Sequence, residues 1–254
     1  MSPKPTIVLV PGAAHSPAAF APTTALLHAA GYDTVGVPLP SVGASPPLQN
    51  WAPDVARIRD TVAALADAGR AIVLFAHSYG GLVACEAVRN LDCASRQHAA
   101  LPGGVLRIVF CAALIGEEGS SLVDARSGVV RDPNWDVQVR VACVRLRSAN
   151  PASTFYNDVP ADEAARLVSL LRPHSFRTFF ERVTFPAWKF LPSTYIVCEN
   201  DRALPLAVQE RLIASAGEGV FAVERCDAGH SPFVSQPGFV ARVIRRAAGE
   251  DVRD

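Results

Sequence analysis

The sequence predicts an α/β fold: a doubly wound, mostly parallel sheet with an inserted, mainly helical cap. Two observations carry this prediction. Short apolar runs rich in Val, Ile and Phe recur along the chain, and several lack alternation, as in strands covered on both faces. Helical patterns separate these runs, which favours right-handed crossovers around a parallel sheet. The runs are Thr6–Val10, Ala71–Ala76, Arg107–Ala113, Thr194–Cys198 and Val220–Glu224.

The clearest helical pattern is Asn50–Ala68, where apolar residues form one stripe between a capping Asn50 and a stop at Gly69. The segment Leu91–Gly104 has the composition of a loop that joins a helix to the next strand. The other predicted helices of the sheet region are Ala18–Ala30, Gly80–Asn90, Leu206–Ala216 and Gly238–Ala248.

Residues 116–192 break this rhythm with many aromatic residues among scattered helical pieces, one of which is Ala161–Leu171. This stretch follows a strand whose carboxyl end should face the crevice of a doubly wound sheet, so it is predicted to cap a site there. A chain of 254 residues fits one domain. We expect a core of residues 1–115 and 193–254 with the cap of residues 116–192 inserted.

The composition describes a globular protein, because half of the residues are hydrophobic and 19% are charged. The zero net charge gives no electrostatic reason to expect binding to nucleic acid or to an anionic membrane surface. No signal peptide is recognised, and no apolar run approaches the ~20 residues that span a bilayer. We therefore expect a cytoplasmic protein that acts on a small, apolar substrate.

The six cysteines include no C-x-x-C pair, so a zinc site is not predicted. Several lie inside apolar strand or helix patterns, where a free cysteine behaves as a small hydrophobic residue. We expect reduced cysteines, no metal and no cofactor.

The strongest local motif is Phe75–Gly81, which reads FAHSYGG and lies between a predicted strand and a predicted helix. This context is typical of a nucleophile elbow, with Ser78 at the strained turn. Gly80 supplies the small residue needed on one side, and Ala76 stands where glycine is more usual on the other. The amino terminus of the following helix favours negative charge beside the serine oxygen.

A serine nucleophile needs a base, and His230 follows the last predicted strand, where its loop should open on the same sheet edge as Ser78. Asp201 follows the preceding strand, which gives the chain order Ser, Asp, His of this kind of site. Glu199 and Asp227 are the alternatives for the acid.

The oxyanion that forms during attack needs N–H donors held in place. We expect these from the Tyr79 amide and from Ala13, in the loop after the first strand, where Gly12 allows close approach. His15 either braces this loop or contacts substrate. The candidate substrate-binding residues are Ala14, His15, Trp135, Tyr156, His174 and Trp188.

The chain resembles the α/β-hydrolase superfamily, above all the branch of plant methylesterases, hydroxynitrile lyases and small bacterial and fungal esterase-like proteins. The resemblance implies ester hydrolysis by a Ser–His–Asp triad through an acyl-enzyme, without metal or organic cofactor, with Ser78, Asp201 and His230 at the matching positions. The segments that carry it are Val8–Ser16, Phe75–Gly81, Tyr195–Gln209 and Gly229–Pro237.

Family lyases that cleave cyanohydrins have a threonine in the oxyanion loop and a lysine after the histidine. Gly12 and Ser231 occupy those positions here, so that chemistry is not expected. Members with epoxide hydrolase or dehalogenase activity use an aspartate nucleophile, which Ser78 excludes.

The main functional hypothesis is a serine hydrolase that cleaves a carboxylic ester, lactone or thioester of an apolar small molecule. One alternative keeps the site but uses His230 as the base for cyclisation or carbon–carbon bond cleavage or formation, as in family members from microbial secondary metabolism. Another alternative is a small-molecule receptor with vestigial hydrolysis. The oligomeric state stays open between a monomer and a homodimer paired through the cap.

Overall fold

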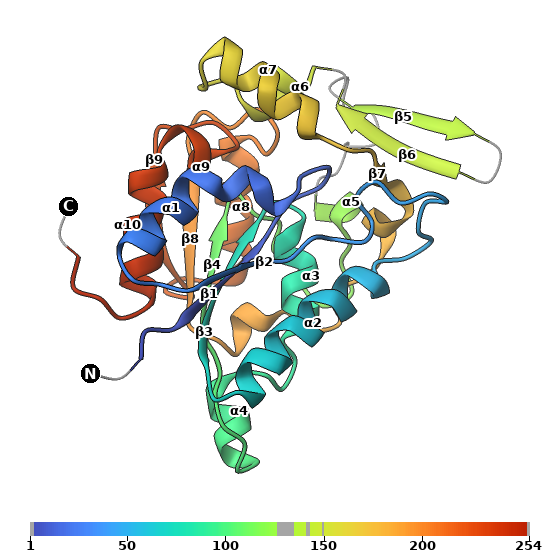
Figure 1. Cartoon of the computed structure of the whole chain (residues 1–254). Coiled ribbons are helices and arrows are strands. Elements are labelled where there is room, and N and C mark those ends of the chain that lie inside the picture. Colours follow the sequence, from blue (N-terminus) through green and yellow to red (C-terminus); the bar gives the residue numbers. More distant parts are fainter. Residues whose placement is uncertain (1–2, 126–134, 141–142, 149, 253–254) are drawn as a thin grey trace.

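The computed structural model describes residues 3–125, 135–140, 143–148 and 150–252. Its centre is a six-stranded sheet in the order β2-β1-β3-β4-β8-β9, with every neighbouring pair parallel (Figure 1). The prediction of a doubly wound parallel sheet is therefore confirmed. The strands are β1 (Thr6–Val10), β2 (Thr34–Gly36), β3 (Ala71–His77), β4 (Gly104–Cys111), β8 (Ser193–Cys198) and β9 (Phe221–Cys226).

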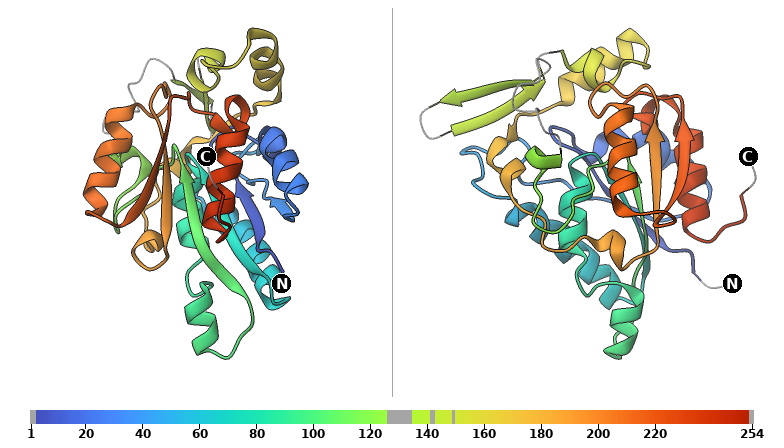
Figure 2. Two further views of the ribbon diagram at one scale, coloured as in Figure 1. Left: turned by 90° about the vertical axis from the view of Figure 1, so that its left-hand side faces the viewer. Right: turned by 180° about the vertical axis from the view of Figure 1, so that it is seen from behind.

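Helices cover both faces of this sheet. Figure 2 shows α1 (Ala21–Ala29) and α10 (Pro237–Ala247) on one side and α8 (Leu206–Ala216) on the other. Helices α2 (Ala52–Asp67) and α3 (Gly80–Ala87) pack with each other on the α8 side.

Alternate side chains of each central strand enter opposite halves of the core. In β1, Ile7 and Leu9 pack in the half of the core that includes α1 and α10, whereas Val8 and Val10 pack in the other half. Each side chain of β1 is buried. Two-sided burial explains why the strand reads as a continuous apolar run in the sequence.

Two elements of the sheet region differ from the prediction. Strand β2, which the sequence did not predict, is three residues long and pairs with β1 from Thr34 to Gly36. Residues 91–104 were predicted to be a loop, but they contain the short helix α4 (Cys93–His98). The Asp92 side chain caps this helix by accepting a hydrogen bond of 2.8 Å from the Ser95 amide.

Residues 116–192, called here the insertion, contain helices as predicted, together with an antiparallel sheet that the sequence did not predict. Three of its strands form a separate antiparallel sheet in the order β5-β6-β7. The pattern that predicts β5 is strict alternation, with Val137 and Val139 between polar residues, rather than an apolar run. The insertion comprises α5 (Leu122–Ala125), β5 (Trp135–Arg140), β6 (Cys143–Ser148), α6 (Pro151–Phe155), α7 (Ala161–Leu170), β7 (His174–Ser175) and 3-10 turns at Phe176–Phe180 and Ala187–Lys189.

Helices α6 and α7 lie beyond the carboxyl ends of the central strands, at the top of the molecule in Figure 1. The short helix α9 (Pro232–Ser235) lies at the same end. Within the described part of the chain, no helix combines the length and the apolar character needed to cross a membrane.

Candidate active site

Ser78 occupies the tight turn between β3 and α3. Its φ of 53° lies in the left-handed region, which is strained for a residue with a side chain. The turn is held by three backbone hydrogen bonds: the Ser78 amide donates to Cys111 (3.2 Å), and the Ser78 carbonyl accepts from Gly81 (3.0 Å) and Leu114 (3.1 Å). Ser78 itself is half-buried. This is the strained strand–turn–helix geometry expected of a nucleophile elbow.

His230 and Asp201 form a buried pair at the same end of the sheet. The Nδ1 atom of His230 lies 2.8 Å from Oδ2 of Asp201, and the two residues are only 2% and 5% exposed. Asp201 follows β8 and His230 follows β9, so the neighbouring parallel strands deliver both side chains to one edge. The pairing orients the ring, because Nδ1–H donates to the carboxylate and Nε2 is left as the basic nitrogen.

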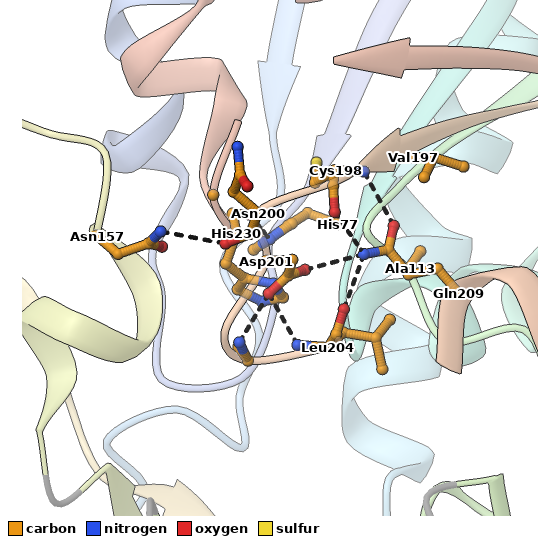
Figure 3. Close-up of polar contacts among 12 residues, drawn as sticks. His77, Ala113, Asn157, Val197, Cys198, Asn200, Asp201, Leu204, Gln209 and His230 are labelled. Atoms are coloured by element: carbon orange, nitrogen blue, oxygen red, sulfur yellow. Dashed lines mark hydrogen bonds and ion pairs between the residues drawn. The ribbon is translucent and has the colours of Figure 1, made fainter. Parts of the chain in front are cut away.

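Three further donors hold the Asp201 carboxylate (Figure 3). Its Oδ1 accepts from the amides of Ala203 (2.7 Å) and Leu204 (2.8 Å), and Oδ2 accepts from Nε2 of Gln209 (3.5 Å). Gln209 is fully buried and bonds to both the amide (3.0 Å) and the carbonyl (2.9 Å) of Cys198. Sequence reasoning missed Gln209, although a glutamine among the apolar residues of α8 was a signal.

The loop after β1 lies directly against the elbow. A Cβ atom on Gly12 would lie 2.8 Å from Cβ of Ser78 and 2.9 Å from Nδ1 of His77, so glycine is needed for this close approach. The next residues turn sharply, with Ala14 at a φ of 66°. In the described part of the chain, neither the Ala13 amide nor the Tyr79 amide donates a hydrogen bond. Two unpaired N–H groups therefore flank the elbow, as oxyanion donors would.

Two buried imidazoles lie beside His230. His77 donates from Nε2 to the His230 carbonyl (3.0 Å), and its ring centroid is 4.6 Å from that of His230. His15 donates from Nδ1 to the Ala13 carbonyl (2.7 Å), which is the bracing contact expected of it. Burial lowers the pKa of His15 to about 4 and that of His77 well below its usual value. Both rings are therefore neutral at pH 7 and act as fixed hydrogen-bond donors.

A buried polar network lies behind the elbow. The Tyr79 hydroxyl donates to Oδ2 of Asp54 (2.8 Å), and the Ser41 amide donates to Oδ1 (2.8 Å). Burial raises the pKa of Asp54, which is 0% exposed. The His174 ring packs edge-on against Tyr79 at 4.7 Å and stacks on Phe179 at 4.9 Å. The network ties the residue after Ser78 to α2 and to the insertion.

A cavity of about 360 Å³ is lined in part by Phe155, at the end of α6. The Phe155 ring lies 5.7 Å from that of His230 and 5.0 Å from that of His15, so this side chain links the cavity lining to the His–Asp pair. Among the described residues that line the cavity, Arg172 is the charged one, and its amide donates to the Ala14 carbonyl at 3.0 Å. The described lining residues are Ala14, Pro151, Phe155, Val168, Leu171, Arg172 and Pro173.

The candidate substrate-binding residues lie in different places. Ala14 lines the cavity, whereas Tyr156 and His15 face a smaller hollow beside α7. His174 is 1% exposed within the polar network. Trp188 belongs instead to the core, where its ring lies 6.0 Å from that of Phe221, the first residue of β9. The reason is that burial of the large indole ring in the core is more favourable than its exposure at a binding site.

Trp135 begins β5, where it pairs with Ser148. Its side chain lies outside the described residues. Phe155, the residue before Tyr156, lines the cavity, and its ring lies 5.7 Å from that of His230.

The parallel sheet, the helices on both faces and the elbow at the carboxyl edge define an α/β-hydrolase fold. Residues 7–243 match the model of the family described as "Alpha/beta hydrolase family". The chain therefore belongs to the α/β-hydrolase family, and it is an enzyme of the hydrolase class.

Three comparisons place it further. The chain is 34% identical to "Alpha/beta hydrolase nvfD" of Aspergillus novofumigatus, over 98% of each chain. It is 30% identical to "Probable hydrolase R7" of a Phoma species, over 97% of this chain and 99% of the relative. The crystal structure of the methylesterase MES16 from Arabidopsis shares the fold, with a TM-score of 0.76 at 21% identity, over 96% of this chain and 99% of that one.

Proposed function

We propose that the protein is a serine hydrolase that cleaves a carboxylic ester, lactone or thioester of an apolar small molecule through an acyl-enzyme on Ser78. The observation that carries the proposal is the buried His230–Asp201 pair, with 2.8 Å between Nδ1 and Oδ2, at the sheet edge that also bears the strained Ser78 turn.

In the proposed first step, Oγ of Ser78 attacks the carbonyl carbon while Nε2 of His230 takes the hydroxyl proton. The tetrahedral oxyanion accepts hydrogen bonds from the Ala13 and Tyr79 amides, which are otherwise unpaired in the described part of the chain. The C–O or C–S bond then breaks, and His230 returns its proton to the leaving group. Asp201 stabilises the imidazolium throughout.

In the second step, a water molecule attacks the acyl-enzyme and His230 takes its proton. The acid is released, and Ser78 regains its hydrogen. This sequence needs only water and the side chains already described, so the proposed activity requires no cofactor. The cavity supports an apolar substrate, because six of the seven described residues that line it are apolar. The insertion supplies most of that lining, and we propose that it acts as a cap.

The test is labelling with a fluorophosphonate probe, followed by peptide mapping of the modified residue. The expected result is one adduct on Ser78, formed more slowly in Asp201→Asn and absent in Ser78→Ala. A folded protein that gives no adduct at Ser78 would exclude the proposal. Turnover of simple p-nitrophenyl esters then separates a hydrolase from a receptor, because a receptor would be labelled but would not turn over.

A further inference from the structure

Two adjacent residues of the insertion hold the two loops that carry the His–Asp pair. They lie in the connection between α6 and α7. Nδ2 of Asn157 donates to the Asn200 carbonyl (3.1 Å), and Oδ2 of Asp158 accepts from the Gly229 amide (2.7 Å). Asn200 immediately precedes Asp201, and Gly229 immediately precedes His230. Figure 3 shows Asn157 reaching from the insertion to the Asn200 backbone.

Asp158 contacts the His230 loop on both sides of the histidine. The same Oδ2 atom that accepts from Gly229 also accepts from the Ser235 hydroxyl at 2.7 Å. Hydrogen bonds to a carboxylate are charge-assisted and stronger than those between neutral groups. One carboxylate oxygen therefore fixes residues 229 and 235, and His230 lies between them.

Both side chains of residues 157 and 158 lie directly over the Gly229 backbone. A Cβ atom on Gly229 would lie 2.4 Å from Oδ1 of Asn157 and 2.6 Å from Oδ1 of Asp158, so a larger residue there would push these two side chains away. The absence of a side chain at Gly229 therefore allows the Asp158 carboxylate to reach the backbone next to His230.

The same segment also shapes the cavity. Phe155 ends α6, lines the cavity and lies 5.7 Å, ring to ring, from His230. Three residues beyond it, Asp158 holds the His230 loop. Asp158 itself is exposed, but Gly229 is buried, so removing the carboxylate leaves a buried backbone N–H without this acceptor. Loss of this hydrogen bond should loosen the position of His230.

We propose that Asp158 is a positioning residue, which couples the seating of the insertion over the cavity to the orientation of His230. The inference rests on the proposed function, in which His230 is the base. It acts through geometry: without the carboxylate, His230 spends less time where Nε2 can accept the Ser78 proton. A misplacement on the order of 1 Å can cost about a hundredfold in rate.

The experiment compares Asp158→Ala, Asp158→Asn and Ser235→Ala in the full chain. Asp158→Ala should lower kcat for a p-nitrophenyl ester by roughly ten- to a hundredfold, with KM changed by no more than about threefold. Asp158→Asn should recover part of the loss, because its amide oxygen still accepts from Gly229. Ser235→Ala removes one of the two hydrogen bonds to Oδ2 and keeps the Gly229 contact, so it should lower kcat less than Asp158→Ala does.

A second readout does not depend on turnover. The Nδ1–H proton of His230 is shielded by Asp201, and NMR can follow its exchange with water. It should exchange faster in Asp158→Ala than in Ser235→Ala. Equal exchange rates in the two variants would overturn the inference, as would an unchanged kcat or a loss that simply follows the melting temperature. An inactive parent with the expected exchange difference would count against the proposed function and leave the positioning role of Asp158 supported.

Discussion

Nδ1 of His230 lies 2.8 Å from Oδ2 of Asp201, although 29 residues separate them in the chain. The pair is buried, and Asp201 receives additional hydrogen bonds from two amides and from Gln209. The carboxylate is therefore fixed before any substrate arrives, and it fixes the histidine in turn. In the proposed reaction, a preorganised pair of this kind stabilises charge without rearrangement.

Asp201→Asn should lower kcat by about a thousand- to ten-thousandfold with little change in KM. The amide keeps the size of the carboxylate but can donate to Nδ1, which favours the wrong tautomer of His230. Steady-state kinetics on a p-nitrophenyl ester measures this. Glu199→Gln is the matched control, because the Glu199 side chain pairs with Arg225 on the surface. Equal losses in both variants would show that Asp201 is not the acid.

Gly12→Ala should reduce both activity and stability. The added Cβ would lie 2.8 Å from Cβ of Ser78 and 2.9 Å from Nδ1 of His77, so the loop has to move away from the elbow. Overpacking of this kind costs about 1–3 kcal/mol, and displacement of the Ala13 amide should lower kcat at least about tenfold.

Gly238→Ala is the control for this substitution. Gly238 lies in the first turn of α10, where a Cβ would meet only Nη1 of Arg242 at an ordinary 3.7 Å. The stability of Gly238→Ala, measured by urea unfolding, should equal or exceed that of the parent. Full activity in Gly12→Ala would contradict the assignment of this loop to the oxyanion site.

Tyr79→Phe should lower the free energy of unfolding by about 1–3 kcal/mol. It removes the hydroxyl that donates to Asp54 and leaves that buried carboxylate with the Ser41 amide. Tyr32→Phe is the control, since its hydroxyl bonds to the surface residue Glu250. If the two variants are equally stable in urea, the Asp54–Tyr79 contact does not contribute as described.

Folding stability should fall as the pH drops below about 6.5, because burial lowers the pKa of three histidines. His15 has a pKa of about 4 and His174 of about 3, and His77 lies well below its usual value. The unfolded chain binds protons below pH 6.5 that the folded protein excludes. The three neutral histidines therefore contribute to folding stability above pH ~6.5. This contribution is lost as the pH falls toward their folded-state pKa values, by at most roughly 1.4 kcal/mol per histidine per pH unit.

Urea unfolding at about pH 7 and about pH 5 measures this loss. His174→Gln should show a smaller loss between the two pH values than the parent. His98→Gln, at an exposed position, should show the same loss as the parent. An identical loss of unfolding free energy in all three proteins would mean that the folded and unfolded chains bind the His174 proton equally well.

The strands that are buried on both faces could be predicted, because two-sided burial gives a continuous apolar run in the sequence. The residues from Ile72 to Phe75 are apolar in succession because both faces of β3 are covered. Strand β2 carries no such signal, since its three residues become a strand only by pairing with β1. The β5–β6 pair was not predicted, because β5 contains no continuous apolar run and its signal is the alternation of Trp135, Val137 and Val139 with polar residues.

The site divides in the same way. Ser78, Asp201 and His230 follow from local motifs and from the rule that parallel strands end at one edge. The residues that hold these side chains in place could not be predicted from local motifs. Asp158 and Gly229 are 71 residues apart, and Asp54 and Tyr79 are 25 apart, so their contacts depend on how the insertion and α2 pack. No local sequence pattern predicts contacts between residues so far apart in the chain.

The most direct test of the account is to trap the acyl-enzyme. The parent protein and Ser78→Ala are mixed with p-nitrophenyl acetate, quenched in acid within the first turnover and examined by intact-mass and peptide mass spectrometry. The account predicts one acetyl group on Ser78 in the parent and neither acetyl group nor ester turnover in Ser78→Ala. Persistent turnover in Ser78→Ala together with its loss in His230→Ala would contradict the account, because the chemistry would then run from His230 without a serine nucleophile.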